Sequence, residues 1–289
     1  MKPDRSTAVP PSDPPLTVAM VVTDLDGTLL DRESRLSAVN RAALVRLGER
    51  GILRVAATGR SLYSARRVLT PDDPFDYVAV SSGAGIVHWP RAKLVRTLPM
   101  AADDTARVCA VFEALALDFM VHAPVPSSHR FVYRRGAVPN PDFDRRLARY
   151  AEHCTLADDT PARWQRPACH VVAIHPEGEQ AHREVVAQLG EAFSVVRTTS
   201  PLDARSVWIE VLPRAASKSQ ACAWVATEHD AVADQVVAVG NDTNDLDMLA
   251  WAGTSYVVAN ATAAMRDRWT TVGAHDADGF AEVVRRTLG

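Results

Sequence analysis

Two aspartates that are one residue apart, Asp24 and Asp26, follow directly on an apolar run in the stretch VVTDLDGTLL (residues 21–30). Ionised carboxylates at the end of a buried strand are costly unless a positive charge lies between them. A hard divalent cation such as Mg²⁺ removes this cost, because it prefers oxygen ligands and keeps room for a substrate phosphate. The spacing therefore suggests metal-assisted chemistry on a phosphorylated compound.

Polar residues also follow the other apolar runs that we expect to be strands. They are Thr58-Gly59-Arg60 after 52–57, Ser81-Ser82-Gly83 after 77–80, the stretch GNDTND (240–245) after 235–239, and Asn260 after 255–259. The carboxyl ends of parallel strands lie at one edge of an open α/β sheet, where ligands bind. We therefore expect carboxylates, hydroxyls, an amide and an arginine to converge on one patch.

Lys218 is one of three lysines among the 32 Lys and Arg residues of the chain. It lies at the start of a predicted helix, where a cation opposes the helix macrodipole. A compact ammonium group that neutralises a phosphate or a cluster of aspartates accounts for a lysine at this place. We expect Lys218 to belong to the same patch.

The elements that must position these residues are predicted to alternate between strand and helix. Helical patterns separate the apolar runs, and they cover residues 36–51, 217–230 and 244–253. The runs themselves do not alternate between apolar and polar residues, which is typical of a parallel sheet covered on both faces. Residues 16–85 and 211–289 are therefore predicted to form a doubly wound, Rossmann-like α/β core.

The middle of the chain has a different pattern. Strands of mixed character are interleaved there with helices near 102–117, 141–153 and 178–190, and buried parallel-type strands resume only after residue 234. We predict that residues 86–210 form an α+β module inserted into the core. Residues 1–15 are rich in proline and are predicted to be a disordered tail.

Composition excludes several classes of function. The net charge of −3 does not favour a nucleic-acid partner, and no apolar run approaches the roughly 20 residues that span a bilayer. The four cysteines are scattered without metal-binding or redox spacing, and the first residues lack the apolar core of a signal peptide. We expect a cytoplasmic protein.

The motifs, in their order along the chain, resemble those of the haloacid dehalogenase (HAD) superfamily, and within it the Cof-type phosphatases of subfamily IIB. The stretches that carry the resemblance are DLDGTLL, ATGR, ASKSQA with Lys218, and GNDTNDLDML. The resemblance extends from about residue 17 to 288. It implies a HAD core, with residues 86–210 as a cap domain that selects the substrate.

The resemblance also implies a role for each motif residue. Asp24 would be the nucleophile that forms an aspartyl-phosphate, and Asp26 would be the general acid and base. The substrate phosphate would be held by Thr58, Gly59, Lys218 and Asn244. The metal would be bound by Asp24, by Asp26 through its main-chain carbonyl, and by the fourth motif through Asn241, Asp242 and Asp245.

The fourth motif departs from the family pattern at one position. Such proteins usually read Gly-Asp-x-x-Asn-Asp, with the first aspartate as a metal ligand, whereas this chain has Asn241 there and an aspartate at 242. Asn241 could coordinate through its amide oxygen, or a small backbone shift could bring in Asp242. We favour Asp242 as the charged contributor, supported by Asp245.

The predicted function is that of a Mg²⁺-dependent phosphatase, a phosphoric monoester hydrolase, acting on a small phosphorylated metabolite such as a sugar phosphate. A phosphomutase or phosphotransferase that uses the same aspartate is one alternative. A non-catalytic binder of phosphorylated ligands is the other, and Asn241 is the feature that favours it.

Overall fold

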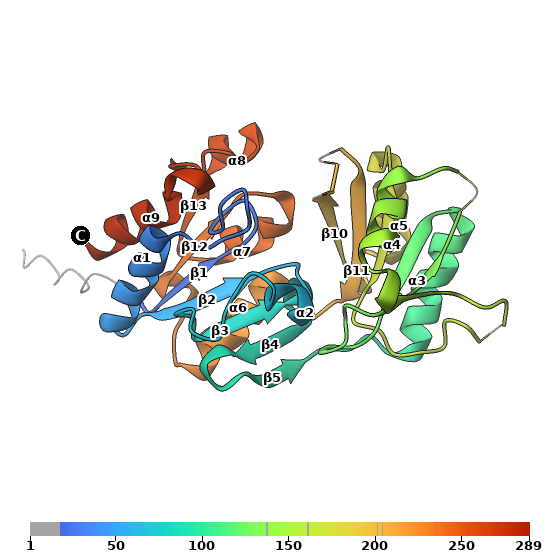
Figure 1. The fold of residues 1–289 in the computed structure, drawn as a ribbon, viewed down its shortest axis with the longest axis horizontal. Coiled ribbons are helices and arrows are strands. Elements are labelled where there is room, and N and C mark those ends of the chain that lie inside the picture. The colour runs from blue at the N-terminus through green and yellow to red at the C-terminus, as the bar shows by residue number, and fades with distance from the viewer. Residues whose placement is uncertain (1–17, 137, 161, 201, 204) are drawn as a thin grey trace, which may run out of the picture.

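The computed structural model describes residues 18–289 apart from residues 137, 161, 201 and 204, and within this part the chain forms two β-sheets, each flanked by helices (Figure 1). The predicted tail at residues 1–15 lies outside the described residues. Among the helices of the described part, none combines the length and the apolar character needed to cross a membrane.

The larger sheet has eight strands in the order β14-β13-β12-β1-β2-β3-β4-β5. Neighbouring strands from β14 to β3 are parallel, and β4 and β5 are antiparallel to their neighbours. The strands are β1 (Met20–Thr23), β2 (Leu53–Ala57), β3 (Tyr77–Val80), β4 (Gly85–His88), β5 (Lys93–Thr97), β12 (Val236–Gly240), β13 (Thr254–Val258) and β14 (Thr270–Val272).

Helices cover both faces of this sheet. Val21 of β1 belongs to a core shared with α1 and α9, whereas Met20 and Val22 point to the other face and pack with residues of α6 and α7. The helices are α1 (Ala38–Glu49), α2 (Leu62–Ala65), α6 (Lys218–Glu228), α7 (Leu246–Trp251), α8 (Ala263–Arg268) and α9 (Gly279–Leu288). A largely parallel sheet between two helical layers is a doubly wound fold, so the predicted fold class is confirmed.

The smaller sheet has six strands in the order β10-β11-β9-β6-β7-β8. One of its faces packs on α3 and α5, and the other packs on α4. Its strands are β6 (Asp118–His122), β7 (Phe131–Arg134), β8 (Cys154–Leu156), β9 (Val171–His175), β10 (Phe193–Thr199) and β11 (Val207–Pro213), and its helices are α3 (Ala102–Ala114), α4 (Pro141–Arg149) and α5 (Glu179–Leu189).

The sheets divide the chain at different residues from those predicted. Strands β4 and β5 extend the larger sheet, although the sequence placed residues from 86 onward in the inserted module. They were misassigned because antiparallel strands have the mixed character expected of the insert, and β5 at the edge of the sheet is largely exposed. Strand β11 continues to Pro213 in the smaller sheet, beyond the predicted boundary at 210. The division into a catalytic core and a cap that acts as a separate domain stays a prediction.

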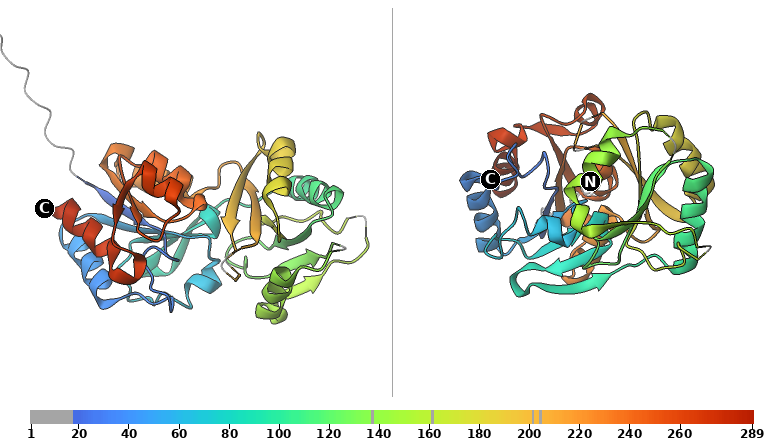
Figure 2. Two further views of the ribbon diagram at one scale, coloured as in Figure 1. Left: turned by 90° about the horizontal axis from the view of Figure 1, so that it is seen from above. Right: turned by 45° about the vertical axis from the view of Figure 1, so that its right-hand side comes forward.

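The register of the larger sheet brings the motifs to one level. Thr23, the last residue of β1, lies opposite Ala56 of β2 and Val239 of β12. Ala57 of β2 lies in turn opposite Ala79 of β3. The segments after these strands therefore emerge side by side at the carboxyl edge of the sheet, and Figure 2 shows the smaller sheet beyond one end of the core.

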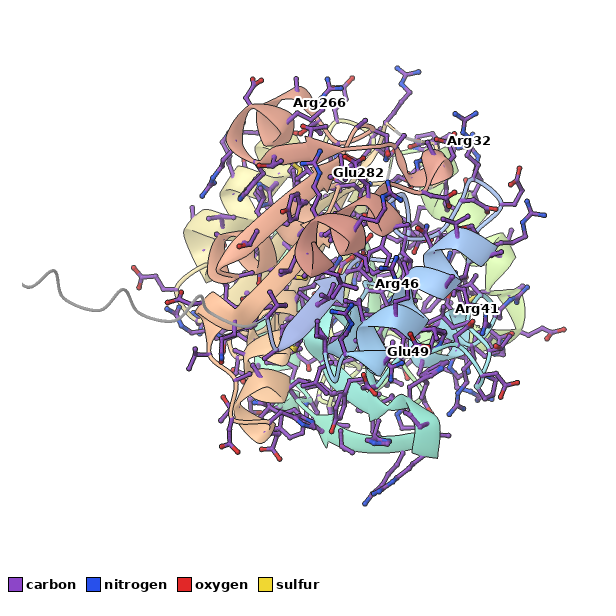
Figure 3. All side chains as sticks on the ribbon, turned by 90° about the vertical axis from the view of Figure 1, so that its left-hand side faces the viewer. Arg32, Arg41, Arg46, Glu49, Arg266 and Glu282 are labelled. Atoms are coloured by element: carbon purple, nitrogen blue, oxygen red, sulfur yellow. The ribbon has the colours of Figure 1, made fainter. Side chains whose placement is uncertain are left out.

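The side of the core remote from the smaller sheet is covered with charged side chains of both signs (Figure 3). Arg46 and Glu49 extend from α1 there, and Arg41 of the same helix forms an ion pair with Asp73. The motif residues lie at the opposite end of the core, next to the smaller sheet.

Candidate active site

A pocket of about 430 Å³ lies between the strand ends of the larger sheet and the smaller sheet. One side, which we call the core wall, consists of the motif loops with Asp24, Asp26, Gly27, Thr58, Gly59, Arg60, Asn241, Asp242 and Asn244. The opposite side, the cap wall, comes from α4, β10 and β11 and consists of Arg146, Arg149, Tyr150, Thr198, Trp208 and Glu210. All the predicted site residues except Lys218 and Asp245 line this pocket.

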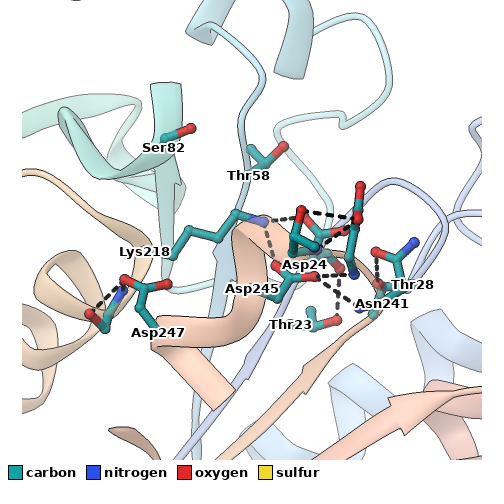
Figure 4. A network of polar contacts seen from close by, with 12 residues as sticks. Thr23, Asp24, Thr28, Thr58, Ser82, Lys218, Asn241, Asp245 and Asp247 are labelled. Atoms are coloured by element: carbon teal, nitrogen blue, oxygen red, sulfur yellow. Dashed lines mark hydrogen bonds and ion pairs between the residues drawn. The ribbon is translucent and has the colours of Figure 1, made fainter. Parts of the chain in front are cut away.

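Lys218 and Asp245 lie directly behind the core wall, in a triad with Asp24 (Figure 4). Lys218 Nζ donates to Asp24 Oδ1 at 2.7 Å and to Asp245 Oδ1 at 2.6 Å. The exposed fractions of the three residues are 2%, 5% and 0% for Lys218, Asp24 and Asp245. The buried ammonium group therefore neutralises an aspartate cluster, which is one of the two roles that the sequence suggested for this lysine.

The triad shares one positive charge between two buried carboxylates. Burial by itself would lower the pKa of Lys218, but Asp24 and Asp245 raise it above the usual lysine value, so the lysine is cationic. Burial raises the pKa of Asp24 to about 7, with Asp245 and Asp26 adding to the rise and Lys218 opposing it. A further cation or a proton at Asp24 would relieve this excess of negative charge.

Asp26 faces the pocket and is held by an arginine of the second motif. Arg60 Nε donates to Asp26 Oδ2 at 2.7 Å and Arg60 Nη2 donates to Asp26 Oδ1 at 2.5 Å, a bidentate contact. Arg60 also donates to Ser64 in α2. The sequence placed Arg60 on this patch without giving it a role; its position directly after Thr58-Gly59 was the available signal.

Gly27 makes room for the fourth motif. Its φ of +70° lies in the left-handed region, and a Cβ on it would lie 2.6 Å from Asn241 Nδ2, so a larger residue could not adopt this turn without displacing the asparagine. On the same side, Thr28 Oγ1 donates to Asn241 Oδ1 at 3.0 Å. Asn241 thus lies against the loop that carries Asp24 and Asp26.

Asp242 and Asp245 of the fourth motif accept hydrogen bonds from backbone N–H groups of their own loop. Asp242 Oδ1 accepts from the Thr243 backbone N–H at 2.7 Å and caps the short turn Thr243–Asp245. Asp245 Oδ2 accepts the backbone N–H groups of Asn241 and Asp242, at 2.8 and 3.1 Å. Asp245 therefore fixes the loop that presents Asn241. Asn241 and Asp242 both line the pocket, and the preference for Asp242 as the contributor to a metal site stays a prediction.

The residues predicted to hold phosphate lie around Asp24. Thr58 is 1% exposed and its Oγ1 accepts the Arg60 backbone N–H at 3.1 Å. Gly59 and Asn244 line the pocket beside it. The loop after β3 seats Lys218, because Gly83 packs so closely on Ser217, the residue before the lysine, that a Cβ would lie 2.1 Å from its carbonyl oxygen.

The side-chain carboxylates do not form a metal cluster by themselves. Within the described residues, no group of three or more His, Cys, Asp or Glu side chains is arranged to hold a metal ion. Arg60 engages Asp26, and Lys218 engages both Asp24 and Asp245. The Asp24 carboxylate and the neutral oxygens of the neighbouring loops lie on the core wall, where a cation could use them together.

Sequence reasoning missed the cap wall. Arg146 and Tyr150 lie in and just after α4, Trp208 and Glu210 lie in β11, and only the fold brings them opposite Asp24. A hydrogen bond from Ser82 Oγ, after β3, to Glu210 Oε2 at 3.0 Å links this wall to the core. No motif marks these residues in the sequence, so no local signal could have found them.

A family model for haloacid dehalogenase-like hydrolases matches residues 21–284. The chain belongs to this family. This match confirms the resemblance drawn from the sequence, and relatives that are named phosphatases confirm the predicted class of phosphoric monoester hydrolase.

Several relatives are named phosphatases. The chain is 26% identical over 294 residues to the 5-amino-6-(5-phospho-D-ribitylamino)uracil phosphatase YwtE of Bacillus subtilis (strain 168), an alignment that covers 93% of this chain and 97% of that protein. It is 24% identical over 246 residues to the HMP-PP phosphatase of Yersinia pseudotuberculosis serotype I (strain IP32953), covering 82% of each. The structure of BT1666 from Bacteroides thetaiotaomicron, a phosphatase of the HAD superfamily, has a TM-score of 0.76 at 20% identity and covers 98% of this chain and 99% of that one.

Proposed function

We propose that this protein is a Mg²⁺-dependent phosphatase that hydrolyses a small phosphorylated metabolite through an aspartyl-phosphate. The observation that carries the proposal is the triad of Asp24, Lys218 and Asp245 at the base of a pocket large enough for a metabolite. The family match and the phosphatase names of the relatives support the same reaction.

The proposed reaction proceeds in two displacements at phosphorus. A carboxylate oxygen of Asp24 attacks phosphorus in line, and the bond from phosphorus to the leaving-group oxygen breaks as Asp26 gives that oxygen its proton. In the second step Asp26 takes a proton from water, the water oxygen attacks phosphorus, and the bond to Asp24 breaks to release phosphate. Asp26 thus regains in the second step the proton that it gave in the first, and Arg60 contacts the carboxylate form that accepts it.

Charge on the transferring phosphoryl group is matched by the residues around Asp24. Lys218 supplies a buried ammonium group beside the attacking carboxylate, and Thr58 and Asn244 supply polar side chains. Cations and dipoles fixed before the reaction stabilise the transition state more than mobile groups do, because they need not reorganise when charge develops.

The core wall fits Mg²⁺ by the chemistry of its donors. The Asp24 carboxylate, the Asp26 main-chain carbonyl and the Asn241 amide oxygen are hard oxygen ligands from residues that line the same side of the pocket. Asp24 carries the excess negative charge left by the shared lysine. Bound there, Mg²⁺ would offset the negative charge of the substrate phosphate.

The test is phosphate release from a panel of phosphorylated metabolites and an aryl phosphate, with Mg²⁺ and with a chelator. We expect release that requires Mg²⁺ and falls at least about 10⁴-fold in Asp24→Asn, since the nucleophile is lost. Asp72→Asn is the matched control, because Asp72 is an exposed aspartate outside the pocket.

Assays on the same purified protein distinguish the phosphatase from the two alternative functions. Transfer of phosphate to a second sugar phosphate, in place of release to water, would establish a phosphomutase or phosphotransferase. Binding of phosphorylated compounds without either reaction would establish a non-catalytic binder. Turnover that persists in Asp24→Asn would contradict the proposed nucleophile.

A further inference from the structure

The cap wall of the pocket carries an arginine whose charge has no ionic partner. Arg146 of α4 lies with its guanidinium carbon 4.2 Å from the ring centroid of Tyr150 and 5.1 Å from that of Trp208. Among the described residues it forms no ion pair with a carboxylate, and its buried Nε has no hydrogen-bond partner. Burial lowers its pKa below the usual arginine value, although Tyr150 and Glu210 act in the opposite direction.

The guanidinium group of Arg146 can still bind a ligand. Tyr150 and Trp208 each present a ring face to its central carbon, and an aromatic ring is a weaker partner for the charge than a carboxylate. Because Arg146 lines the pocket and makes no ion pair among the described residues, its N–H groups can donate to a bound molecule. A planar fork of donors matches the two oxygens of a carboxylate or a phosphate.

Neighbouring groups of the cap wall point to the same ligand chemistry. Arg149 lies three residues further along α4, on the same helix face, and also lines the pocket. Thr198 Oγ1 of β10 is buried in this wall without a hydrogen-bond partner among the described residues. Glu210 is the acidic group nearby, and burial raises its pKa, which weakens it as a counter-ion for Arg146.

We propose that Arg146 binds a second anionic group of the substrate, a carboxylate or a second phosphate, on the leaving-group side of the phosphate that is hydrolysed. The substrate class is then a phosphorylated metabolite with two anionic ends, one at the core wall and one at the cap wall. This inference rests on the proposed phosphatase function for its reacting end, while the anion site itself is a property of the cap wall.

Matched pairs of compounds test this inference. Glycerol 3-phosphate and 3-phosphoglycerate differ by a carboxylate, and fructose 6-phosphate and fructose 1,6-bisphosphate differ by a phosphate, so the two pairs distinguish the two sources of the anion. In the wild-type protein we expect KM to be about 10- to 100-fold lower for the compound with two anions in at least one pair. Arg146→Gln should abolish this preference and leave the KM of the compound with a single anionic group within about threefold.

The matched control is Arg145→Gln, which removes an exposed arginine of the same helix outside the pocket and should keep the preference. Arg146→Lys keeps the charge but loses the planar fork, so its preference should lie between those of wild type and Arg146→Gln. Thermal unfolding of each variant shows whether it is folded. If Arg146→Gln does not fold, the comparison of Arg146→Lys with wild type decides the result.

Binding to the Asp24→Asn protein separates this inference from the proposed function. Calorimetric titration of the same compounds, with and without the Arg146→Gln change, measures the anion site without turnover. If no compound is hydrolysed but the doubly anionic one binds through Arg146, the phosphatase proposal fails and the anion site stands. The anion site fails if neither pair shows a preference in the wild-type protein, or if the preference survives in Arg146→Gln.

Discussion

The two walls of the pocket differ in how their charges are paired. At the core wall, Lys218 joins Asp24 and Asp245, and Arg60 joins Asp26, so that each of these ionic groups already has a partner of opposite sign. At the cap wall, Arg146 packs against aromatic rings and has no ion pair within the described part of the chain, and the carboxylate of Glu210 accepts from the neutral Ser82 hydroxyl.

The difference in pairing suggests that the two walls have different roles, one in the reaction and one in the choice of substrate. The paired charges of the core wall hold the reacting groups in one geometry before a substrate arrives, which is what a common phosphoryl-transfer step requires. Unpaired groups at the cap wall leave their binding capacity for the part of the substrate that differs from one compound to another. We infer that chemistry is set at the strand ends and selectivity at α4, β10 and β11.

Removal of Lys218 should have the largest effect, because it breaks the pairing of the core wall. In Lys218→Met two buried carboxylates lose their cation, and we expect the free energy of unfolding to fall by about 3–5 kcal/mol. Turnover of any folded protein should fall by about 10²- to 10³-fold, since a fixed charge beside the transferring phosphate is lost. Denaturant unfolding and initial rates measure the two effects.

Lys93→Met provides the comparison for this change, because Lys93 is exposed on β5. Its stability and turnover should match those of the wild-type protein. A Lys218→Met protein as stable as wild type would show that the triad does not stabilise the core wall.

Substitutions in the fourth motif should have effects of intermediate size. Asn241→Ala removes the amide oxygen that lies against the Asp24 loop, and we expect the Mg²⁺ concentration for half-maximal activity to rise by about tenfold. Asp242→Ala removes the cap of the Thr243–Asp245 turn and should change that concentration by less than about threefold. Titration calorimetry with Mg²⁺ measures, without turnover, whether Asn241→Ala weakens Mg²⁺ binding more than Asp242→Ala does. A larger effect of Asp242→Ala would restore the preference drawn from the sequence.

The core wall could be predicted from the sequence because most of its residues directly follow a predicted strand. Buried runs mark β1, β2, β3 and β12, and in a parallel sheet the loops after these strands must meet at one edge. The loop after β1 and the lysine that starts α6 were found in this way. The pattern could not supply the pairing of the charges, so the contact between Arg60 and Asp26 was not foreseen, and the choice between Asn241 and Asp242 as metal ligand stays a prediction.

The cap wall could not be predicted because nothing local marks it. Arg146 and Trp208 lie on a helix and a strand that are far apart in the chain, and each has the appearance of an ordinary surface or core residue in the sequence. Their placement depends on how α4 packs on the smaller sheet and how that sheet faces the core. The hairpin of β4 and β5 was misassigned for a related reason, since the pairing partner of a strand is not encoded in its own residues alone.

The smallest expected effect concerns Glu210, the buried carboxylate of the cap wall, which is 7% exposed. Burial raises its pKa above the usual 4.5, although the hydrogen bond from Ser82 and the charges of Arg146 and Lys218 oppose the rise. A group whose pKa is higher in the folded state stabilises the fold fully below its unfolded pKa, and this contribution is lost as the pH rises through the folded pKa. Glutamine at this position does not titrate.

Glu210→Gln should therefore become more stable relative to wild type as the pH rises above about 4.5, and the difference should become constant once the pH exceeds the folded pKa. Urea unfolding of both proteins across this range measures the difference, with the exposed Glu49→Gln as a control that should show no such trend. A difference that does not vary with pH, or that favours wild type at neutral pH, would mean that Glu210 is stabilised as a carboxylate by Arg146. The cap wall would then be paired like the core wall, and the contrast between them would disappear.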